Sequence, residues 1–137
     1  TAAVLDAISQ VEMDGLDIQF TLVENVQHSE LIEQVSKNDL VIDWLNPEFG
    51  IYGVFSIESM AQGRTVICTL TDSLYGKYDL PIISIQPEDL VSKITEIYND
   101  RQILADKGRS GHDFVQKYHN PMESAKTVIE RYKAVLG

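Results

Sequence analysis

The stretch Gly50-Ile51-Tyr52-Gly53-Val54-Phe55-Ser56-Ile57-Glu58-Ser59-Met60-Ala61-Gln62-Gly63, followed by Arg64-Thr65-Val66-Ile67-Cys68, decides the fold. A glycine-containing loop leads into a helix, Gly63 ends that helix, and an apolar strand follows. The start of a helix carries free backbone N–H groups and a partial positive charge, so it can bind a phosphate. Glu58 lies one turn after Val54, and because helical side chains lean toward the N-terminus, its carboxylate points to the same end. The stretch therefore predicts an anion site beside an acceptor for sugar hydroxyls, as a nucleotide sugar requires.

Apolar periodicity on either side of this stretch predicts alternating helices and strands. The expected strands are Leu16–Leu22, Leu40–Ile42, Thr65–Leu70 and Pro81–Ile85, and the expected helices lie at about residues 2–12, 31–35, 54–62, 87–98 and 121–132. A polar loop is expected through Gly76, and Gly108 and Gly111 are expected to loosen the segment before Tyr118. Short apolar strands between helices indicate a parallel sheet with helices on both faces. We therefore expect one α/β domain over residues 1–137, with a doubly wound, Rossmann-like sheet.

The last expected helix has a clear start signal. Asn120 is a suitable N-cap, Pro121 suits the first helical position, and Glu123 completes a capping box. Its apolar residues are expected to face the core: Ala125, Val128, Ile129 and Tyr132.

The chain resembles the donor-binding, "group 1" C-terminal domain of the retaining GT-B glycosyltransferases. The family motif Glu-Ala-Met-Ala-x-Gly-x-Pro-Val-Ile is similar to residues 58–67, Glu-Ser-Met-Ala-Gln-Gly-Arg-Thr-Val-Ile. Asn38–Trp44 resembles the strand before the motif, Leu80–Ile83 the strand after it, and Lys117–Pro121 the loop before the last helix. The resemblance covers nearly the whole chain in the family's order.

The resemblance implies transfer of a hexose from a nucleoside-diphosphate sugar to an acceptor hydroxyl with retention, without a metal or other cofactor. It implies that Glu58 binds the donor ribose; from the residues alone, a solvated helix glutamate stays an alternative.

The same resemblance places backbone amides near the donor sugar and phosphates, at Tyr52, Gly53, Val54 and Phe55. A glycine that only permits a tight turn is the alternative for Gly53. Val26, at the expected end of a strand, is a further candidate for packing on the nucleotide base. His28 lies nearby as a loop or N-cap histidine or as a ligand contact.

Gly50 departs from the family pattern. Many members carry a glutamate eight positions before the second one, and that count leads from Glu58 to Gly50. Glu48 lies two positions earlier. The contact nearest the reacting centre is therefore unassigned, and the sequence names no catalytic residue.

In the resembling family, a central first strand and a loop with basic residues precede the first helix. We therefore expect Thr1–Gly137 to be a fragment of a longer chain, whose N-terminal domain binds the acceptor. The sheet is expected to lack its first strand, which favours pairing of two copies along the open edge. We also expect the fragment to bind the donor weakly and to catalyse no turnover.

Composition narrows the function classes. The net charge of −10 argues against nucleic acid or an anionic membrane as the main partner. No apolar run approaches the roughly 18 residues of a membrane span. Cys68, the only cysteine, is expected to be a buried apolar residue in a reducing compartment, which favours a cytoplasmic location. His112 and His119 have no cysteine or carboxylate cluster beside them, so no metal site is expected.

Two other classes of function stay open. One is a non-enzymatic descendant of the GT-B fold that serves as an interaction or regulatory module, which Gly50 favours. The other is an unrelated doubly wound binding domain, such as a receiver or a flavodoxin-like protein. The sequence lacks the strand-end acidic pattern of receivers and the Ser/Thr-rich phosphate loop of flavodoxins.

Overall fold

Three short parallel strands form the sheet of the computed structural model, which describes all residues from Thr1 to Gly137. Their order is β1 (Leu40–Ile42), β2 (Thr65–Cys68) and β3 (Ile83–Ser84), with β2 in the centre. Val41 lies opposite Val66, and Ile67 lies opposite Ile83. All of β2 is buried, as the apolar run of its sequence predicts. The expectation of a mixed α/β chain with a parallel sheet is confirmed.

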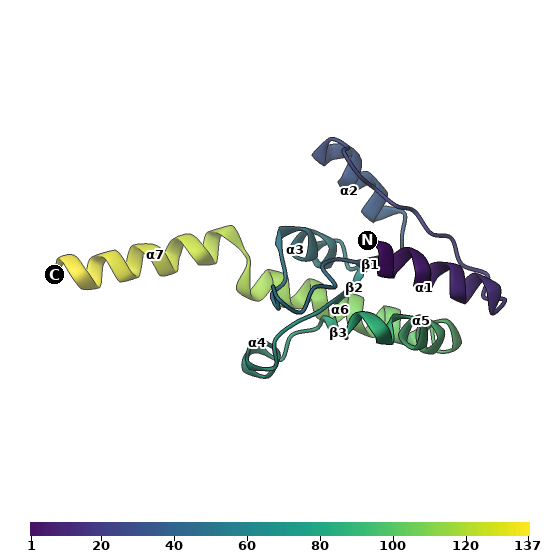
Figure 1. The fold of residues 1–137 in the computed structure, drawn as a ribbon. Coiled ribbons are helices and arrows are strands. Elements are labelled where there is room, and N and C mark those ends of the chain that lie inside the picture. The colour runs from purple at the N-terminus through teal and green to yellow at the C-terminus, as the bar shows by residue number, and fades with distance from the viewer.

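Helices fill most of the remaining chain (Figure 1). They are α1 (Ala2–Met13), α2 (His28–Ser36), α3 (Val54–Ala61), α4 (Asp72–Tyr78), α5 (Leu90–Asn99), α6 (Gln102–Tyr118) and α7 (Pro121–Leu136), and a 3-10 turn η1 (Pro87–Asp89) precedes α5.

Two apolar clusters lie on opposite faces of the sheet, because successive strand residues point to opposite sides. On one face Val66 and Cys68 pack with Met60 of α3 and Phe114 of α6. On the other face Ile67 and its neighbours pack with buried residues of α1 and α5. Helices thus cover both faces of β2, and α3 is held against the sheet by its own buried side, Ser56, Ser59 and Met60.

The expected strand Leu16–Leu22 is wrong. The only backbone hydrogen bond made between residues 17 and 24 runs from Ile18 N to Leu16 O, so this segment is paired with no strand. Its apolar side chains Ile18 and Phe20 nevertheless pack on the α1/α5 cluster. Alternation therefore identified the buried side of the segment, while no partner strand lies close enough to complete a ladder.

The glycines in the C-terminal half have other roles than expected. Gly76 lies inside α4 rather than in a loop. Gly108 and Gly111 lie inside α6 and do not loosen it. A Cβ on Gly108 would lie 2.2 Å from Gly63 O, and one on Gly111 would lie 3.0 Å from Met60 Cγ. These glycines allow α6 to approach α3 closely.

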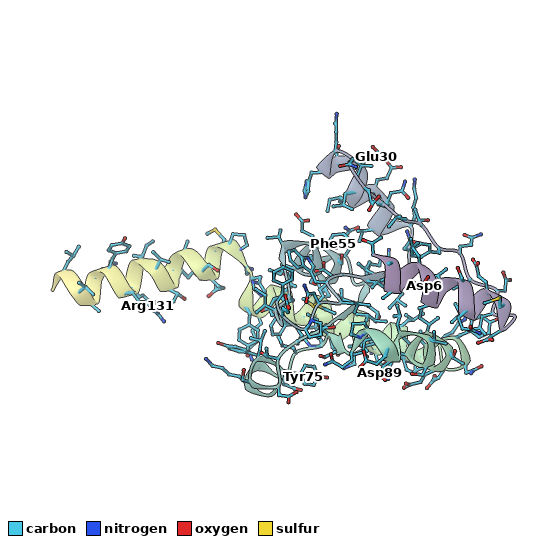
Figure 2. The ribbon with its side chains drawn as sticks, in the orientation of Figure 1. Asp6, Glu30, Phe55, Tyr75, Asp89 and Arg131 are labelled. Carbon is cyan, nitrogen blue, oxygen red and sulfur yellow. The ribbon has the colours of Figure 1, made fainter.

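Asn120 and Pro121 start α7 as predicted, and Asn120 Oδ1 accepts a hydrogen bond from Met122 N at 2.9 Å. The predicted capping box is not formed, because Glu123 Oε1 accepts a hydrogen bond from Lys126 Nζ instead. The apolar face of α7 does not turn inward, and no residue of α7 is buried. Val128, Ile129 and Tyr132 are each more than half exposed. The helix extends away from the rest of the molecule, as the side chains around Arg131 show (Figures 1 and 2). The amphipathic pattern identified the apolar face of α7, but no other part of this chain packs against that face.

None of the helices of this chain has the length and apolar character needed to cross a bilayer.

Candidate functional site

The loop that leads to α3 is built around Gly50. Its φ of +56° lies in the left-handed region, and its carbonyl accepts a hydrogen bond from Thr71 N at 2.8 Å. A Cβ at this position would lie 2.4 Å from Thr71 Cγ2. A side chain at this position, where many members of the resembling family carry a glutamate, would therefore be strained and would require Thr71 to move.

The first turn of α3 is partly capped by Asp43, which follows β1 directly. Ser56 Oγ donates a hydrogen bond to Asp43 Oδ2 at 2.5 Å. Burial raises the pKa of Asp43, and hydrogen bonding from the Ser56 side chain and from the backbone N–H groups of Trp44, Gly53 and Ser56 opposes that rise. The protein thus supplies its own negative group to the positive end of α3. Sequence reasoning missed this role, although a carboxylate directly after a buried strand was a usable signal.

Two amides of the same turn stay open. Val54 N and Phe55 N make no backbone or side-chain hydrogen bond within the chain. Val54 is 69% exposed, whereas Phe55 is half-buried. Gly53 has an extended backbone, and a Cβ there would make only ordinary contacts with Trp44 and Asp43. The turn itself therefore does not require a glycine at this position.

Glu58 lies one turn further along α3 and contacts α2. Its Oε1 is 2.7 Å from Nε2 of His28, the first residue of α2. The other carboxylate oxygen, Oε2, has no hydrogen-bond partner in the chain. The Glu58 side chain is 28% exposed, so it is reachable from solvent. Val26 is partly exposed two positions before His28. The structure brings Glu58 and His28 together across 30 positions of sequence.

The side chain of Tyr52 belongs to the packing between the loop and α6. Its hydroxyl is 3.2 Å from Nε2 of His119, and its ring meets the edge of Phe114. Burial raises the pKa of Tyr52 and lowers the pKa of His119. Any ligand contact of Tyr52 would therefore come from its backbone.

Cys68 is fully buried, as predicted. Burial, together with the charge of Asp43, raises the pKa of its thiol to about 11. A thiol with such a pKa is protonated at neutral pH and is no nucleophile.

A large apolar cavity lies beside the sheet, between the segment 17–23 and β1, with a volume of about 950 Å³. Among the residues predicted to bind the donor, Phe55 alone lines it. Glu58 and the exposed amide of Val54 lie outside the cavity. The candidate anion site and the cavity are therefore distinct features.

No group of three or more histidine, cysteine, aspartate or glutamate side chains is arranged to hold a metal ion. Comparisons of the chain with family models, with curated proteins and with solved structures each gave no match.

Proposed function

We propose that this chain is the nucleotide-sugar-binding half of a retaining GT-B glycosyltransferase, with its sheet as part of a doubly wound, Rossmann-like arrangement. The whole enzyme would act in the cytoplasm and transfer a hexose to an acceptor hydroxyl, held by an N-terminal domain of the same protein. The observation that carries the proposal is the pair of open amides at Val54 and Phe55, one helical turn from the carboxylate of Glu58.

The two features suit the two ends of a nucleoside diphosphate. Amides at the start of a helix donate to phosphate oxygens, and a carboxylate accepts from the two hydroxyls of a ribose. Oε2 of Glu58 is free to accept such bonds while Oε1 holds His28. Gly53 has no side chain to cover the backbone at this point, and Trp44 Nε1 and Asp43 Oδ2 lie 3.7 and 3.9 Å from where its Cβ would be. No catalytic residue is assigned.

Asp43 limits how tightly this chain binds an anion by itself. Its carboxylate lies at the same helix end and offsets part of the positive potential there. Leaving-group stabilisation in glycosyl transfer requires positive charge beside the diphosphate. We therefore expect weak binding by residues 1–137 and no turnover, with the missing cations supplied by the rest of the enzyme.

The test is a titration of the ¹⁵N-labelled chain with UDP, GDP and dTDP, followed by amide shifts. We expect one of these nucleotides to shift Gly53, Val54 and Phe55 at up to millimolar concentration, and Glu58→Gln to weaken that binding severalfold. Glu96→Gln, on an exposed face of α5, is the matched control and should bind as the parent does. Unperturbed amides with all three nucleotides would rule out this site.

A non-enzymatic interaction module is the second candidate. It is favoured by the carboxylate of Asp43 at the helix start and by the loop, in which a side chain at Gly50 would be strained. This alternative predicts that no nucleotide perturbs α3, and that the longer protein shows no transferase activity with any sugar donor.

A further inference from the structure

His28 joins the start of α2 to the side chain of Glu58 on α3. Its Nε2 lies 2.7 Å from Glu58 Oε1. A carboxylate only accepts hydrogen bonds, so the imidazole donates through Nε2. His28 is the first residue of α2, and the hydrogen bond from Leu31 N to Gln27 O closes the first turn of that helix. The imidazole is therefore attached to regular helical backbone, which fixes the place from which it reaches Glu58.

The two helices do not depend on this pair for their packing. Val35 of α2 and Met60 of α3 belong to one buried apolar cluster, which anchors both helices. The His28 side chain, by contrast, is 68% exposed. An ion pair this exposed adds little to the free energy of folding. The main effect of His28 is therefore on the position of the Glu58 carboxylate.

The pair leaves one oxygen of Glu58 for a ligand. Oε1 is engaged by His28, and Oε2 has no partner in the chain. A solvated glutamate samples several rotamers, and it loses this freedom when a ligand binds it. Because His28 already restricts the rotamer, less freedom is lost when a hydroxyl binds Oε2. The helix rise separates Glu58 from the open amide of Val54 by about 6 Å along the axis, which suits the ribose and the phosphates of one nucleotide.

We propose that His28 is a positioning residue: it holds the Glu58 carboxylate ready for both hydroxyls of a ribose, so that the site prefers a ribonucleoside diphosphate to its 2′-deoxy counterpart. This inference rests on the proposed function. A carboxylate oxygen has two lone pairs, so Oε2 can accept from the 2′- and the 3′-hydroxyl of one ribose. A 2′-deoxyribose leaves one lone pair without a partner, and a site arranged for a hydroxyl discriminates against a ligand that lacks it. His28 acts through Glu58 and does not itself contact the ligand.

The test measures how tightly the ¹⁵N-labelled chain binds UDP, GDP, their 2′-deoxy counterparts and inorganic diphosphate, from the amide shifts of Val54 and Phe55. We expect the parent to bind the preferred ribonucleotide at least about threefold more tightly than its 2′-deoxy counterpart. His28→Ala should weaken binding of that ribonucleotide about threefold to fivefold and reduce the preference for ribose. The affinity for inorganic diphosphate should stay unchanged, whereas a purely structural role of His28 would weaken every ligand alike.

His28→Gln is the conservative variant, because its side-chain amide presents an N–H group near the position of Nε2. It should bind the ribonucleotide within about twofold of the parent. In a Glu58→Ala background, His28→Ala should have no further effect, because the group through which it acts is gone.

His112→Ala is the matched control. His112 is an exposed histidine of α6 that lies beside the carboxylate of Asp113, so it resembles His28 in exposure and in pairing. Its loss should change none of these affinities. Circular dichroism should give the same spectrum for all variants and the parent.

Three results overturn the inference while the proposed nucleotide site stands. In the first, nucleotides shift the amides of Val54 and Phe55, but the parent shows no preference for ribose. In the second, that preference is the same in His28→Ala as in the parent. In the third, His28→Ala binds the ribonucleotide more tightly, because the imidazole competes with the ribose for Glu58. If neither a nucleotide nor inorganic diphosphate shifts these amides, the proposed function itself is overturned, and this inference with it.

Discussion

Asp43 and Ser56 join the end of β1 to the first turn of α3, since Ser56 Oγ donates to Asp43 Oδ2. The bond fixes a half-buried carboxylate at the helix end where the proposed donor diphosphate would lie. The same carboxylate caps part of the helix and repels a second anion. Stability and ligand affinity at this site are therefore linked through the protonation of one side chain.

Asp43→Asn should remove a pH dependence of stability. Burial raises the pKa of Asp43 in the folded state, so the folded chain binds this proton more tightly than the unfolded chain does. The resulting stabilisation is complete below the unfolded pKa of about 3.9 and is lost as the pH rises through the folded pKa. Urea unfolding between about pH 3.5 and about pH 7 should show this loss for the parent and not for Asp43→Asn. Asp6→Asn, an exposed aspartate of α1, should keep the parent's profile.

Gly108→Ala should destabilise the fold by more than about 2 kcal/mol. The new Cβ would lie 2.2 Å from Gly63 O, and backbone atoms of α6 or of the loop after α3 must move to relieve the clash. Gly76→Ala in α4 is the matched control, because nothing lies within 4 Å of the added Cβ. Gly76→Ala should stabilise the folded chain by up to about 1 kcal/mol, because alanine has a higher helix propensity than glycine. Urea unfolding measures both, and equal effects would contradict the close contact.

Gly50→Ala should lower the free energy of unfolding, and the size of this loss should depend on Thr71. The left-handed φ of +56° strains any residue with a Cβ by about 1–2 kcal/mol, and the clash with Thr71 Cγ2 adds to that strain. Thr71→Ser removes the clashing methyl and keeps the hydroxyl. In the Thr71→Ser background, Gly50→Ala should therefore cost at least about 1 kcal/mol less than in the parent. A double-mutant cycle by urea unfolding measures this coupling, and strictly additive values would contradict it.

Removal of residues 123–137 should leave the body of the protein intact. No residue of α7 is buried, so its loss should shift the melting temperature by no more than about 2 °C. A longer deletion that starts at Phe114 is the control, because Phe114 and Val115 belong to the core and their loss should abolish cooperative unfolding. Differential scanning calorimetry compares the two, and a large loss from the shorter deletion would show that α7 packs on the body in solution.

The sequence predicted those elements whose signals are local. Asn120 and Pro121 located the start of α7 because a cap and a fixed φ act within one turn. The buried strand β2 was predicted because it is apolar throughout. The stretch around Gly63 gave a helix ended by a left-handed glycine, which has a φ of +70°.

What the sequence missed depends on contacts between distant segments. Alternation in Leu16–Leu22 gave the correct buried side, but a strand also needs a neighbour at hydrogen-bonding distance. Gly108 was interpreted as a loosening residue because its partner, Gly63, lies far away in sequence. The same applies to the site: the start of α3 was predicted from local signals, whereas the capping role of Asp43 needed the folded loop.

Gly63, just after the end of α3, and Gly108 of α6 meet main chain to main chain, so neither residue has a side chain that could move aside at this contact. Sliding of one helix along the other is thereby blocked. If a ligand tilts the start of α3, α6 turns together with α3, and the movement is transmitted to the first turn of α7.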